Sequence, residues 1–583
     1  MPPLPAYIGP GAGFAFLGSF LTLVASLAAG LASVLIWPFR MTWLFMKRPR
    51  GAVKKIVFLG FDGLDPKVTE RLMDEGKLPN FVRLKEQGGY RRLRTTFPAL
   101  SPVAWSTFAT GVNPAKHNIF DFLTRDLRTY APELSSAKVT RTSVEMRRKS
   151  EPFWKILGRN AVSSTILRVP VTFPPEAFNG RLLSAMCTPD LRGTQGTFQE
   201  FSAAEGNVIG PEGESTPFRV TEGILEIQGQ RFPLTAGEYT PWVRLKFPSA
   251  RGIARFLRTA HGLYVTPVQI DPERPALPIS HPRYYATYLA KLLGSFSTLG
   301  MAEDTWALNE EAIDQKAFLD QAALIQKERE AMFFGALDHL RHGVVACVFD
   351  TSDRVQHMCF NDKAIIENLY RDMDRILGRT LPYIDNQTAL FVLSDHGFCA
   401  FRRGVNLNSW LLREGYLAYN GEIDWSRTRA YTIGLGGVYL NIKGREAQGT
   451  VDPAQADALR REIAAKLTGL RDGGILAIER AYPATDIYHG PYLYAAPDLI
   501  VGYADGYRAA WGAALGEVSP EVFEDNNKAW CGDHCVDPRL VPGVLFSNRP
   551  LHAEDPGIED MAPTALTLFG VEVPAWMEGK YVG

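Results

Sequence analysis

The stretch that decides the fold is residues 54–62, KKIVFLGFD, a short apolar run that ends in an acidic residue. Such a run is typical of a strand that is buried on both faces of a parallel sheet. Ligands bind at the carboxyl ends of the strands in open α/β sheets. Asp62 is therefore a candidate site residue, although a single aspartate in a turn is more often structural.

The same pairing of strand and acid recurs along the chain. Residues 343–349 (GVVACVF) predict a buried strand with Asp353 shortly after it, and residues 389–393 (ALFVL) predict another that leads to Asp395. Further strands are expected over 161–169, 498–501 and 544–546, and helical spacing is found over 68–87, 284–293 and 310–339. This alternation predicts a mostly parallel, doubly wound α/β sheet.

The hydrophobic period changes between residues 197 and 282. Short alternating runs between turn signals, over 218–227, 239–247 and 263–270, predict a β-rich insertion that caps the site. Residues 171–189 are rich in Pro, Gly and Thr and are expected to form a loop.

These patterns divide the chain into an anchor, a catalytic domain and an insertion. The expected bounds are 1–50 for a membrane anchor and basic linker, 51–196 and 283–583 for a catalytic α/β domain, and 197–282 for the insertion.

The first 39 residues carry no charge, and residues 12–36 (AGFAFLGSFLTLVASLAAGLASVLI) are apolar. As a helix this run would span about 37 Å at ~1.5 Å per residue, enough to cross a hydrocarbon core of about 30 Å. A cleaved signal peptide fits less well, because no basic segment precedes the run and the run is long. A retained single-pass anchor in the lipid bilayer is expected.

Basic residues follow the apolar run, and no acidic residue occurs before Asp62. The cluster comprises Arg40, Lys47, Arg48, Arg50, Lys54 and Lys55. Positive charge concentrates on the cytoplasmic side of membrane helices. The catalytic domain is therefore expected on the cytosolic side of the cell membrane, with the extracytoplasmic side as the alternative.

The overall charge and the cysteine content exclude two classes of protein. Lys plus Arg and Asp plus Glu both number 63, so no nucleic-acid binding that relies on net positive charge is expected. Six cysteines in 583 residues do not make a disulfide scaffold. Cys531 and Cys535 flank His534, and they could pair, help to bind a metal or stay free thiols.

Residues 95–117 (TTFPALSPVAWSTFATGVNPAKH) place a serine at a predicted helix start. The Ser101-Pro102 pair favours extended backbone, and apolar spacing from Val103 onward predicts the helix. A helix N-terminus is a natural anion site, and a hydroxyl there is what phosphoryl transfer to a serine needs. Ser101 taken alone is more often an ordinary N-cap.

Six acidic and imidazole side chains provide the wider pattern. Asp353 and His357 are four residues apart, which places both on one face of a helix. Each motif alone is more often structural, but three aspartates and three histidines together suit borderline divalent metals such as zinc. The six candidates are Asp62, Asp353, His357, Asp395, His396 and His534.

The order of these motifs resembles the alkaline phosphatase superfamily, and most closely its type I phosphodiesterase/nucleotide pyrophosphatase branch. The matching pieces are FDG at 61–63, KLPNFVRL at 77–84, SPVAWSTFATGVNPAKHNIFDF at 101–122, DRVQH at 353–357, SDHGF at 394–398, GDH at 532–534 and IEDMAPTALTLFGVEVPAWMEGKYV at 558–582. The resemblance implies an alkaline phosphatase-like fold and metal-dependent hydrolysis of phosphoester bonds.

The resemblance also implies a role for each candidate residue. Two divalent metal ions are expected, with zinc favoured and manganese as the alternative. One ion would be held by Asp353, His357 and His534. The second would be held by Asp62, Asp395 and His396, with the Ser101 oxygen bound to it as nucleophile.

Two positions depart from the family pattern. Many relatives use threonine where this chain has Ser101, and serine keeps the hydroxyl. Nucleotide-cleaving relatives place a phosphate-binding asparagine five residues after the histidine that matches His117, whereas this chain has Phe122 there, beside Asp121. This difference weakens the expectation of nucleotide pyrophosphatase activity. The Cys/Ser-x-Pro-x-Arg signature of the sulfatase branch is absent around Ser101.

Arg402 and Arg403 follow the SDHGF motif and are candidates for binding an anionic substrate, although solvated surface cations are equally expected there. The leading hypothesis is a membrane-anchored, two-metal phosphoester hydrolase, either a phosphodiesterase or a phosphatase, that acts through a phosphoseryl intermediate on a membrane-proximal substrate. The alternatives are a phosphotransferase that moves a phospho-head group to a lipid or glycan hydroxyl, and an inactive metal-stabilised scaffold.

Overall fold

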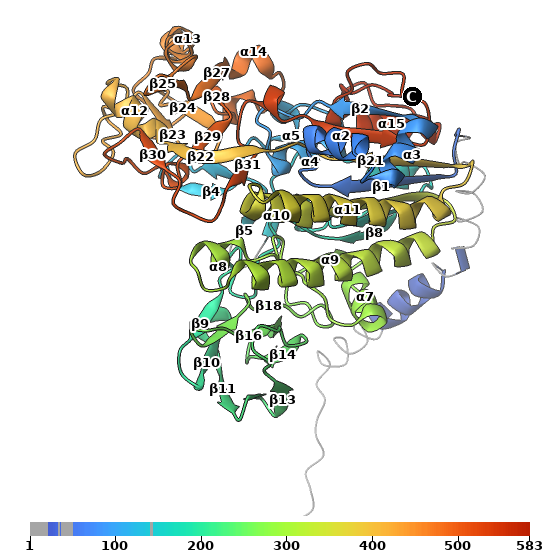
Figure 1. The fold of residues 1–583 in the computed structure, drawn as a ribbon. Coiled ribbons are helices and arrows are strands. Elements are labelled where there is room, and N and C mark those ends of the chain that lie inside the picture. The colour runs from blue at the N-terminus through green and yellow to red at the C-terminus, as the bar shows by residue number, and fades with distance from the viewer. Residues whose placement is uncertain (1–20, 33–34, 37–50, 140–143) are drawn as a thin grey trace, which may run out of the picture.

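The computed structural model describes residues 21–32, 35–36, 51–139 and 144–583. Within these residues, the central sheet contains eight strands (Figure 1). In spatial order they are β19 (Ser280–His281), β8 (Gly180–Leu183), β7 (Ser164–Leu167), β20 (Gly343–Phe349), β1 (Lys55–Phe61), β21 (Thr388–Leu393), β32 (Gly543–Ser547) and β2 (Gly89–Leu93).

Most of this sheet is parallel. The pairings from β8 through β7, β20 and β1 to β21 are parallel. The pairings of β19 with β8, β21 with β32 and β32 with β2 are antiparallel. This topology confirms the predicted mixed α/β fold with a central, mostly parallel sheet.

The middle strand β1 places the candidate residues at one edge of the sheet. Phe61, its last residue, pairs with Phe349 of β20, and Gly60 pairs with Leu393 of β21. Every residue of β20 and β21 is buried, as expected for strands covered on both faces. Asp62 and the segments that follow β20 and β21 therefore leave the sheet side by side.

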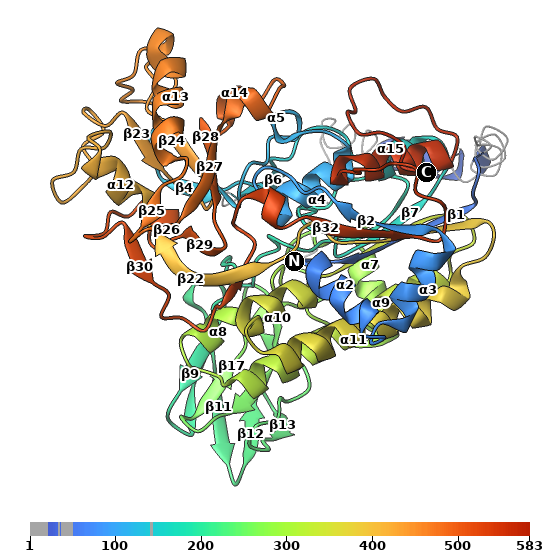
Figure 2. The ribbon, with the colours of Figure 1, turned by 45° about the horizontal axis from the view of Figure 1, so that its top comes forward.

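Helices cover both faces of the sheet (Figure 2). Val57 and Leu59 of β1 belong to the core beneath the first helical layer, whereas Ile56 and Phe58 belong to the core beneath the second. The first layer contains α2 (Pro66–Asp74), α3 (Pro79–Gln87), α9 (Gln315–Asp338) and α11 (Lys363–Thr380), and the second contains α4 (Ser101–Thr110), α6 (Phe153–Arg159) and α15 (Met561–Leu568). The alternation along β1 is what a pleated strand between two cores requires.

Three local predictions differ from the structure. The segment 171–189, predicted to be a loop, contains β8, which belongs to the central sheet. The segment 218–227, predicted as one alternating run, is a hairpin of β11 (Ser215–Thr221) and β12 (Ile224–Ile227). The strand predicted at 498–501 is β28 (Leu499–Tyr503), which pairs in a separate sheet rather than in the central one.

That separate sheet consists, among the described residues, of β23 (Ala430–Thr432), β24 (Gly437–Leu440), β28 and β27 (Ile478–Pro483), and its pairings are antiparallel. It lies beyond the carboxyl edge of the central sheet, with α12 (Leu407–Arg413) and α13 (Ala456–Leu467) around it (Figure 1). One of its flanking loops contributes Leu435 to the site described below.

The segment 197–282 is rich in β-structure. It holds strands from β9 (Gln199–Phe201) to β18 (Gln269–Ile270), arranged in small antiparallel sheets that project below α8 (Thr305–Asn309) and α9 (Figure 1). Its last strand, β19, pairs with β8 in the central sheet. The proposed domain boundaries themselves stay a prediction.

The apolar run at 12–36 lies largely outside the described residues. The described parts, residues 21–32 and 35–36, are helical and exposed. In the described part of the chain, every helix falls short of the combination of length and apolar character that a membrane crossing requires. The basic linker up to residue 50 lies outside the described residues.

Candidate active site

The site begins where β1 ends. Asp62 is fully buried, and its N–H donates to the carbonyl of Phe349, 3.0 Å away. Gly63 follows with a φ of +72° and donates its N–H to Asp395 Oδ1 at 3.3 Å. A Cβ at position 63 would lie 2.5 Å from the ring of Phe398, so the turn needs glycine on both counts.

Ser101 is the first residue of α4 rather than the residue before it. Leu100 is the N-cap and makes no side-chain capping bond, so the interpretation of Ser101 as an N-cap is wrong. The Ser101 hydroxyl donates to Asp62 Oδ1 at 3.3 Å, and its Oγ lies 3.1 Å from Nε2 of His396.

The helix start offers fewer donors than predicted. The N–H groups of Val103 and Ala104 both donate to the carbonyl of Leu100, at 2.9 Å each. They are therefore satisfied within the first turn of α4. What α4 supplies to the site is the position of the Ser101 hydroxyl.

Asp62, Asp395 and His396 come together as the sequence predicts. Their candidate ligand atoms all lie within 4.8 Å of one another. The Nε2 atom of His396 is 3.3 Å from Asp395 Oδ2 and 3.5 Å from Asp62 Oδ1. All three side chains are fully buried. This is the set that the resemblance assigns, with Ser101, to one cation.

The second predicted set surrounds the Asp353 carboxylate. Asp353 and His357 both lie on α10 (Thr351–Cys359), on one face as predicted. The Oδ1 atom of Asp353 is 3.3 Å from Nε2 of His357 and 3.6 Å from Nε2 of His534. Its carboxylate therefore lies between two imidazoles from distant parts of the chain.

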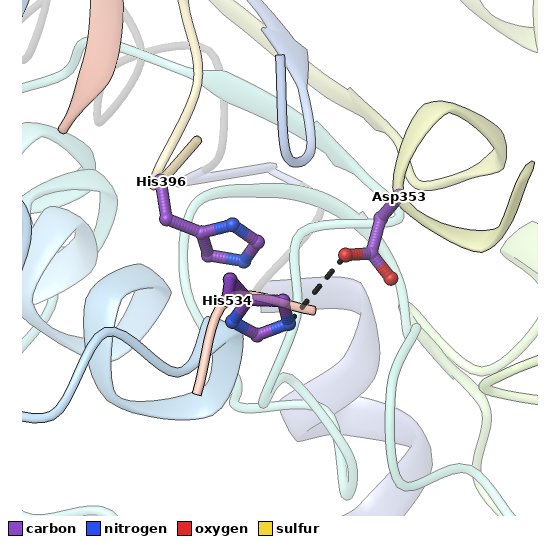
Figure 3. A group of neighbouring side chains, drawn as sticks. All are labelled: Asp353, His396 and His534. Atoms are coloured by element: carbon purple, nitrogen blue, oxygen red, sulfur yellow. Dashed lines mark ion pairs between the residues drawn. The ribbon is translucent and has the colours of Figure 1, made fainter. Parts of the chain in front are cut away.

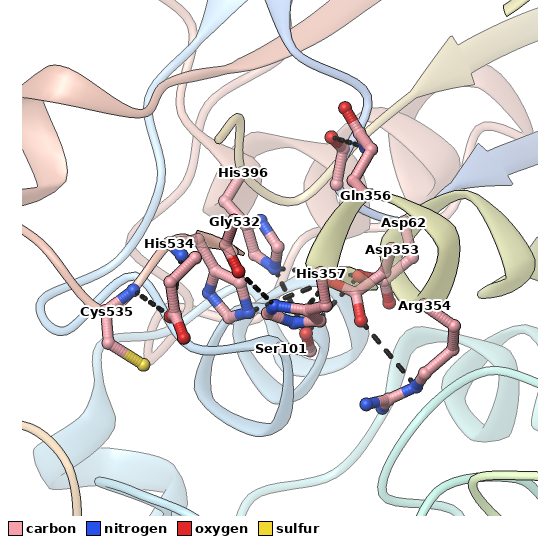
Figure 4. Close-up of polar contacts among 12 residues, drawn as sticks. Asp62, Ser101, Asp353, Arg354, Gln356, His357, His396, Gly532, His534 and Cys535 are labelled. Carbon is pink, nitrogen blue, oxygen red and sulfur yellow. Dashed lines mark hydrogen bonds and ion pairs between the residues drawn. The ribbon is translucent and has the colours of Figure 1, made fainter. Parts of the chain in front are cut away.

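His396 joins the two sets into one cluster. The atoms of Asp353, His396 and His534 lie within 4.8 Å of one another, a compact group that contains His396 where the prediction has His357 (Figure 3). The rings of His396 and His534 stack with their centroids 3.6 Å apart. All six candidates thus converge with Ser101, and Figure 4 shows all of them except Asp395 labelled.

The three histidines share one pattern of contacts at their ring nitrogens. Each Nδ1 lies against a backbone carbonyl, 2.8 Å for His357 with Gly532, 2.6 Å for His534 with Ala99 and 3.1 Å for His396 with Gly397. A carbonyl only accepts, so Nδ1 carries the proton and Nε2 has a free lone pair. In each ring this Nε2 faces the carboxylates. Imidazoles that bind metals are held in this way.

Two carboxylate oxygens of the cluster, Asp353 Oδ1 and Asp395 Oδ2, are buried and lack a hydrogen-bond partner among the described residues. Burial, followed by the charges of Asp395 and Asp353, raises the pKa of Asp62, and burial with the charge of Asp353 raises the pKa of Asp395 to about 7. Uncompensated buried charge is costly. The donor set therefore fits divalent cations.

Asp533 holds the turn that carries His534, a role that sequence reasoning missed. Its Oδ1 accepts the N–H groups of His534 and Cys535, both at 2.8 Å. Its Oδ2 accepts Arg508 Nη1 at 3.0 Å and Trp530 Nε1 at 2.8 Å. With both oxygens engaged, Asp533 positions His534. Cys531 and Cys535 do not form a disulfide, and Cys535 lies with Asp533 and His534 in a group whose potential ligand atoms are within 4.8 Å of one another.

A cavity of about 380 Å³ opens next to the cluster, and Ser101, Asp353, His357 and His534 lie in its wall. The wall as a whole is largely apolar. The apolar lining includes Phe122, Pro267, Leu299, Trp306, Leu435, Trp511, Leu515 and Trp530. Pro267 belongs to the β-rich segment, so that segment forms part of the cavity.

The two arginines predicted to bind substrate are not found in this wall. Among the described residues, the cavity lining does not include Arg402 or Arg403. Arg402 is exposed, and Arg403 pairs with Asp472 at 2.6 Å and with Asp525. The cationic residues that line the cavity are instead Arg354 and Arg508, which the sequence analysis did not single out.

His117 and Asp121 support the surrounding backbone. His117 is fully buried, with Nε2 2.9 Å from Thr107 Oγ1 and Nδ1 accepting the N–H of Ile119. Asp121 accepts the N–H groups of Leu435 and Gly436, and burial raises its pKa to about 6. These contacts indicate a structural role for His117.

The chain is similar in sequence or fold to several known proteins. A family model described as type I phosphodiesterase / nucleotide pyrophosphatase matches residues 56–516. Phosphonoacetate hydrolase from Sinorhizobium meliloti 1021, solved with phosphonoacetate, is 14% identical with a TM-score of 0.48, over 90% of this chain and 97% of that chain. Human ectonucleotide pyrophosphatase / phosphodiesterase 5 is 11% identical with a TM-score of 0.43. The match covers 90% of this chain and 97% of that chain. No curated protein sequence matches the chain.

Proposed function

Because the chain belongs to the type I phosphodiesterase/nucleotide pyrophosphatase family of metal-dependent phosphoester hydrolases, we propose that it hydrolyses phosphoesters with two metal ions and a phosphoseryl intermediate at Ser101. The observation that carries this proposal is the position of the Ser101 hydroxyl, 3.3 Å from Asp62 and 3.1 Å from His396. A hydroxyl among buried metal-type ligands is the arrangement that an activated serine nucleophile needs.

Each residue of the cluster has a proposed role. Asp62, Asp395 and His396, together with Ser101, would hold one divalent cation, and Asp353, His357 and His534 would hold the other. Zinc suits three carboxylates and three imidazoles, with manganese as the alternative. When bound, such ions lower the pKa of a hydroxyl and neutralise charge on phosphoryl oxygens.

The residues themselves arrange a double displacement. Asp62 accepts the hydrogen bond of the Ser101 hydroxyl and so fixes the direction in which Oγ points. Oγ attacks phosphorus, the bond to the ester alcohol breaks, and the alcohol leaves. Water then attacks the phosphorus of the phosphoserine, and the bond between phosphorus and Oγ breaks. Phosphate or a phosphomonoester is released, and the Ser101 hydroxyl is restored.

The membrane anchor belongs to the same proposal. Residues 12–36 are apolar, and in the described helical part of this run Leu23, Leu27 and Leu31 are 59% to 64% exposed. A chain that starts at residue 51 should stay soluble when the full chain sediments with membranes. Protease digestion of sealed vesicles would decide between the cytosolic side, favoured by the basic residues, and the extracytoplasmic side.

The decisive experiment screens the purified full chain against phosphomonoesters, phosphodiesters, nucleotides and phospholipid head groups, with metal analysis of the same sample. Release of free product in water supports hydrolysis. Turnover that requires an acceptor alcohol supports the phosphotransferase instead. A metal-loaded protein that turns over no substrate class, with or without an acceptor, would favour the inactive scaffold.

A further inference from the structure

The two arginines in the described wall of the cavity have different surroundings. The Nη1 atom of Arg508 donates to Asp533 at 3.0 Å, and its guanidinium lies 4.0 Å from the centre of the Trp511 ring. The Nε atom of Arg508 is also buried without a partner, but Arg354 makes, among the described residues, no side-chain hydrogen bond at all. Its Nε lies 3.7 Å from Asp353 Oδ2, beyond hydrogen-bond distance. That Nε is buried and, among the described residues, has no hydrogen-bond partner.

The position of Arg354 is fixed by its helix. Its N–H donates to the carbonyl of Asp350 at 3.1 Å, in the first turn of α10, and only 6% of the residue is exposed. Arg354 directly follows Asp353, and Figure 4 shows its side chain beside the Asp353 carboxylate. Arg354 and Ser101 line the same cavity.

An unsatisfied donor on a charged group is costly, and the buried Nε of Arg354 is such a donor. Because Arg354 lines the cavity, an anionic ligand there would add acceptors for the rest of its guanidinium. The planar guanidinium matches two oxygens of a phosphate at once, which an ammonium group does not. Phe122, which lines the same cavity, offers no polar group for this purpose.

We propose that Arg354 binds the non-bridging phosphoryl oxygens of the substrate and so positions phosphorus for Ser101. The ligand class is a phosphate monoester or diester anion, and inorganic phosphate as the product. This inference rests on the proposed function of the Ser101 site. The competing explanation is that Arg354 only balances the charges of nearby acids, Asp353, Asp350 and Glu303, and a lysine would serve that purpose as well.

The test measures binding of inorganic phosphate by calorimetry to the full, metal-loaded chain carrying Ser101→Ala. Arg354→Met and Arg354→Lys are then added, and the metal content of each protein is measured. We expect Arg354→Met to weaken phosphate binding by about 100-fold and Arg354→Lys by about 10-fold, because each loses charge-assisted hydrogen bonds. Arg402→Met, the same substitution at an exposed arginine outside the cavity, should leave the affinity unchanged.

Two outcomes would overturn the proposal. One is an Arg354→Met protein that binds phosphate as tightly as its parent. The other is an Arg354→Lys protein that keeps the parent affinity, since charge balance alone would then explain Arg354. If Arg354→Met loses metal, the lysine variant, which keeps the charge beside Asp353, decides the question.

Turnover measurements separate this proposal from the proposed function. With Ser101 intact, Arg354→Lys should raise KM by about 10-fold and lower kcat as well, because both the substrate and the transition state carry phosphoryl oxygens. Failure of the proposed function would appear elsewhere, as substrate turnover that persists in Ser101→Ala. Loss of turnover in Ser101→Ala with unchanged phosphate binding in both Arg354 variants would refute the role of Arg354 alone.

Discussion

The Oγ atom of Ser101 and the Nε2 atom of His396 lie 3.1 Å apart, although 295 positions separate them in the sequence. The contact arises because β1 and β21 are parallel neighbours, and Asp62 and His396 follow them at the same edge of the sheet. The start of α4 then brings Ser101 to both residues. The proposed nucleophile and the residues around it are thus brought together by the order of the strands.

Replacing Ser101 by alanine tests the proposed nucleophile. We expect Ser101→Ala to lose turnover of p-nitrophenyl phosphodiesters by about 10³-fold or more, because no other group replaces Oγ. Metal content should stay near normal, because six other ligands remain. Ser106→Ala is the matched control, since Ser106 Oγ donates to the carbonyl of Pro102 inside the same helix. Activity that survives in Ser101→Ala would rule out Ser101 as the nucleophile.

Asp395→Ala tests the assignment of a metal ligand. Its Oδ2 lies 3.3 Å from Nε2 of His396 and is otherwise unpartnered among the described residues. We expect elemental analysis to show the loss of one ion. Asp385→Ala is the control, because Asp385 lies just before β21 and pairs with Lys55 at the surface. Full metal occupancy in Asp395→Ala would contradict the assignment.

Removing metal should destabilise the whole protein. Asp62, Asp353 and Asp395 are buried close together, and without cations their charges repel. An ion present at 1,000 times its Kd stabilises the folded state by about 4 kcal/mol. We expect a chelator to lower the thermal midpoint and zinc or manganese to restore it, as read by differential scanning fluorimetry. A midpoint that does not move after verified metal removal would speak against a structural contribution of the ions.

His117 should make the free energy of unfolding depend on pH. Burial, with a smaller effect from the charge of Arg148, lowers the pKa of His117 to about 3, whereas an unfolded histidine titrates near 6.5. Between these values the unfolded chain binds more protons, so the free energy of unfolding rises with pH. The contribution is complete above about pH 6.5 and is lost as the pH falls towards 3, amounting to at most about 5 kcal/mol.

The measurement for His117 is urea unfolding at several pH values from 4.5 to 7. His117→Gln cannot titrate, so its free energy of unfolding should vary less steeply over this range. His261→Gln, a change at an exposed histidine, serves as the control. Identical pH dependence in the wild type and in His117→Gln would show that His117 does not make this contribution.

The sequence predicts the centre of the fold well and its edges poorly. β1, β20 and β21 are continuous apolar runs, because burial on both faces leaves no place for polar residues. β8 has only four residues beside a Pro-rich stretch, and its pairing with β7 and β19 makes it a strand. The apolar pattern of β28 predicts a strand but carries no information about which sheet it joins.

In the site, too, some residues can be predicted from the sequence and others cannot. The six metal-type residues could be found because each lies close to a recognisable motif. Arg354 lies inside one of those motifs, yet an arginine beside an aspartate on a helix is usually solvated, and only burial distinguishes it. Arg402 and Arg403 also lie next to a recognisable motif, but in the strand that follows it neither residue belongs to the described cavity lining.

The ligand set spans the chain from Asp62 to His534, in a protein of 583 residues. During translation, a nascent chain therefore contains the first candidate ligand long before the last one. The growing polypeptide can form β1 and its neighbours on the ribosome, but it cannot assemble the complete ligand set before His534 has emerged. We therefore expect the proposed metal centre to be completed only after His534 has been synthesised.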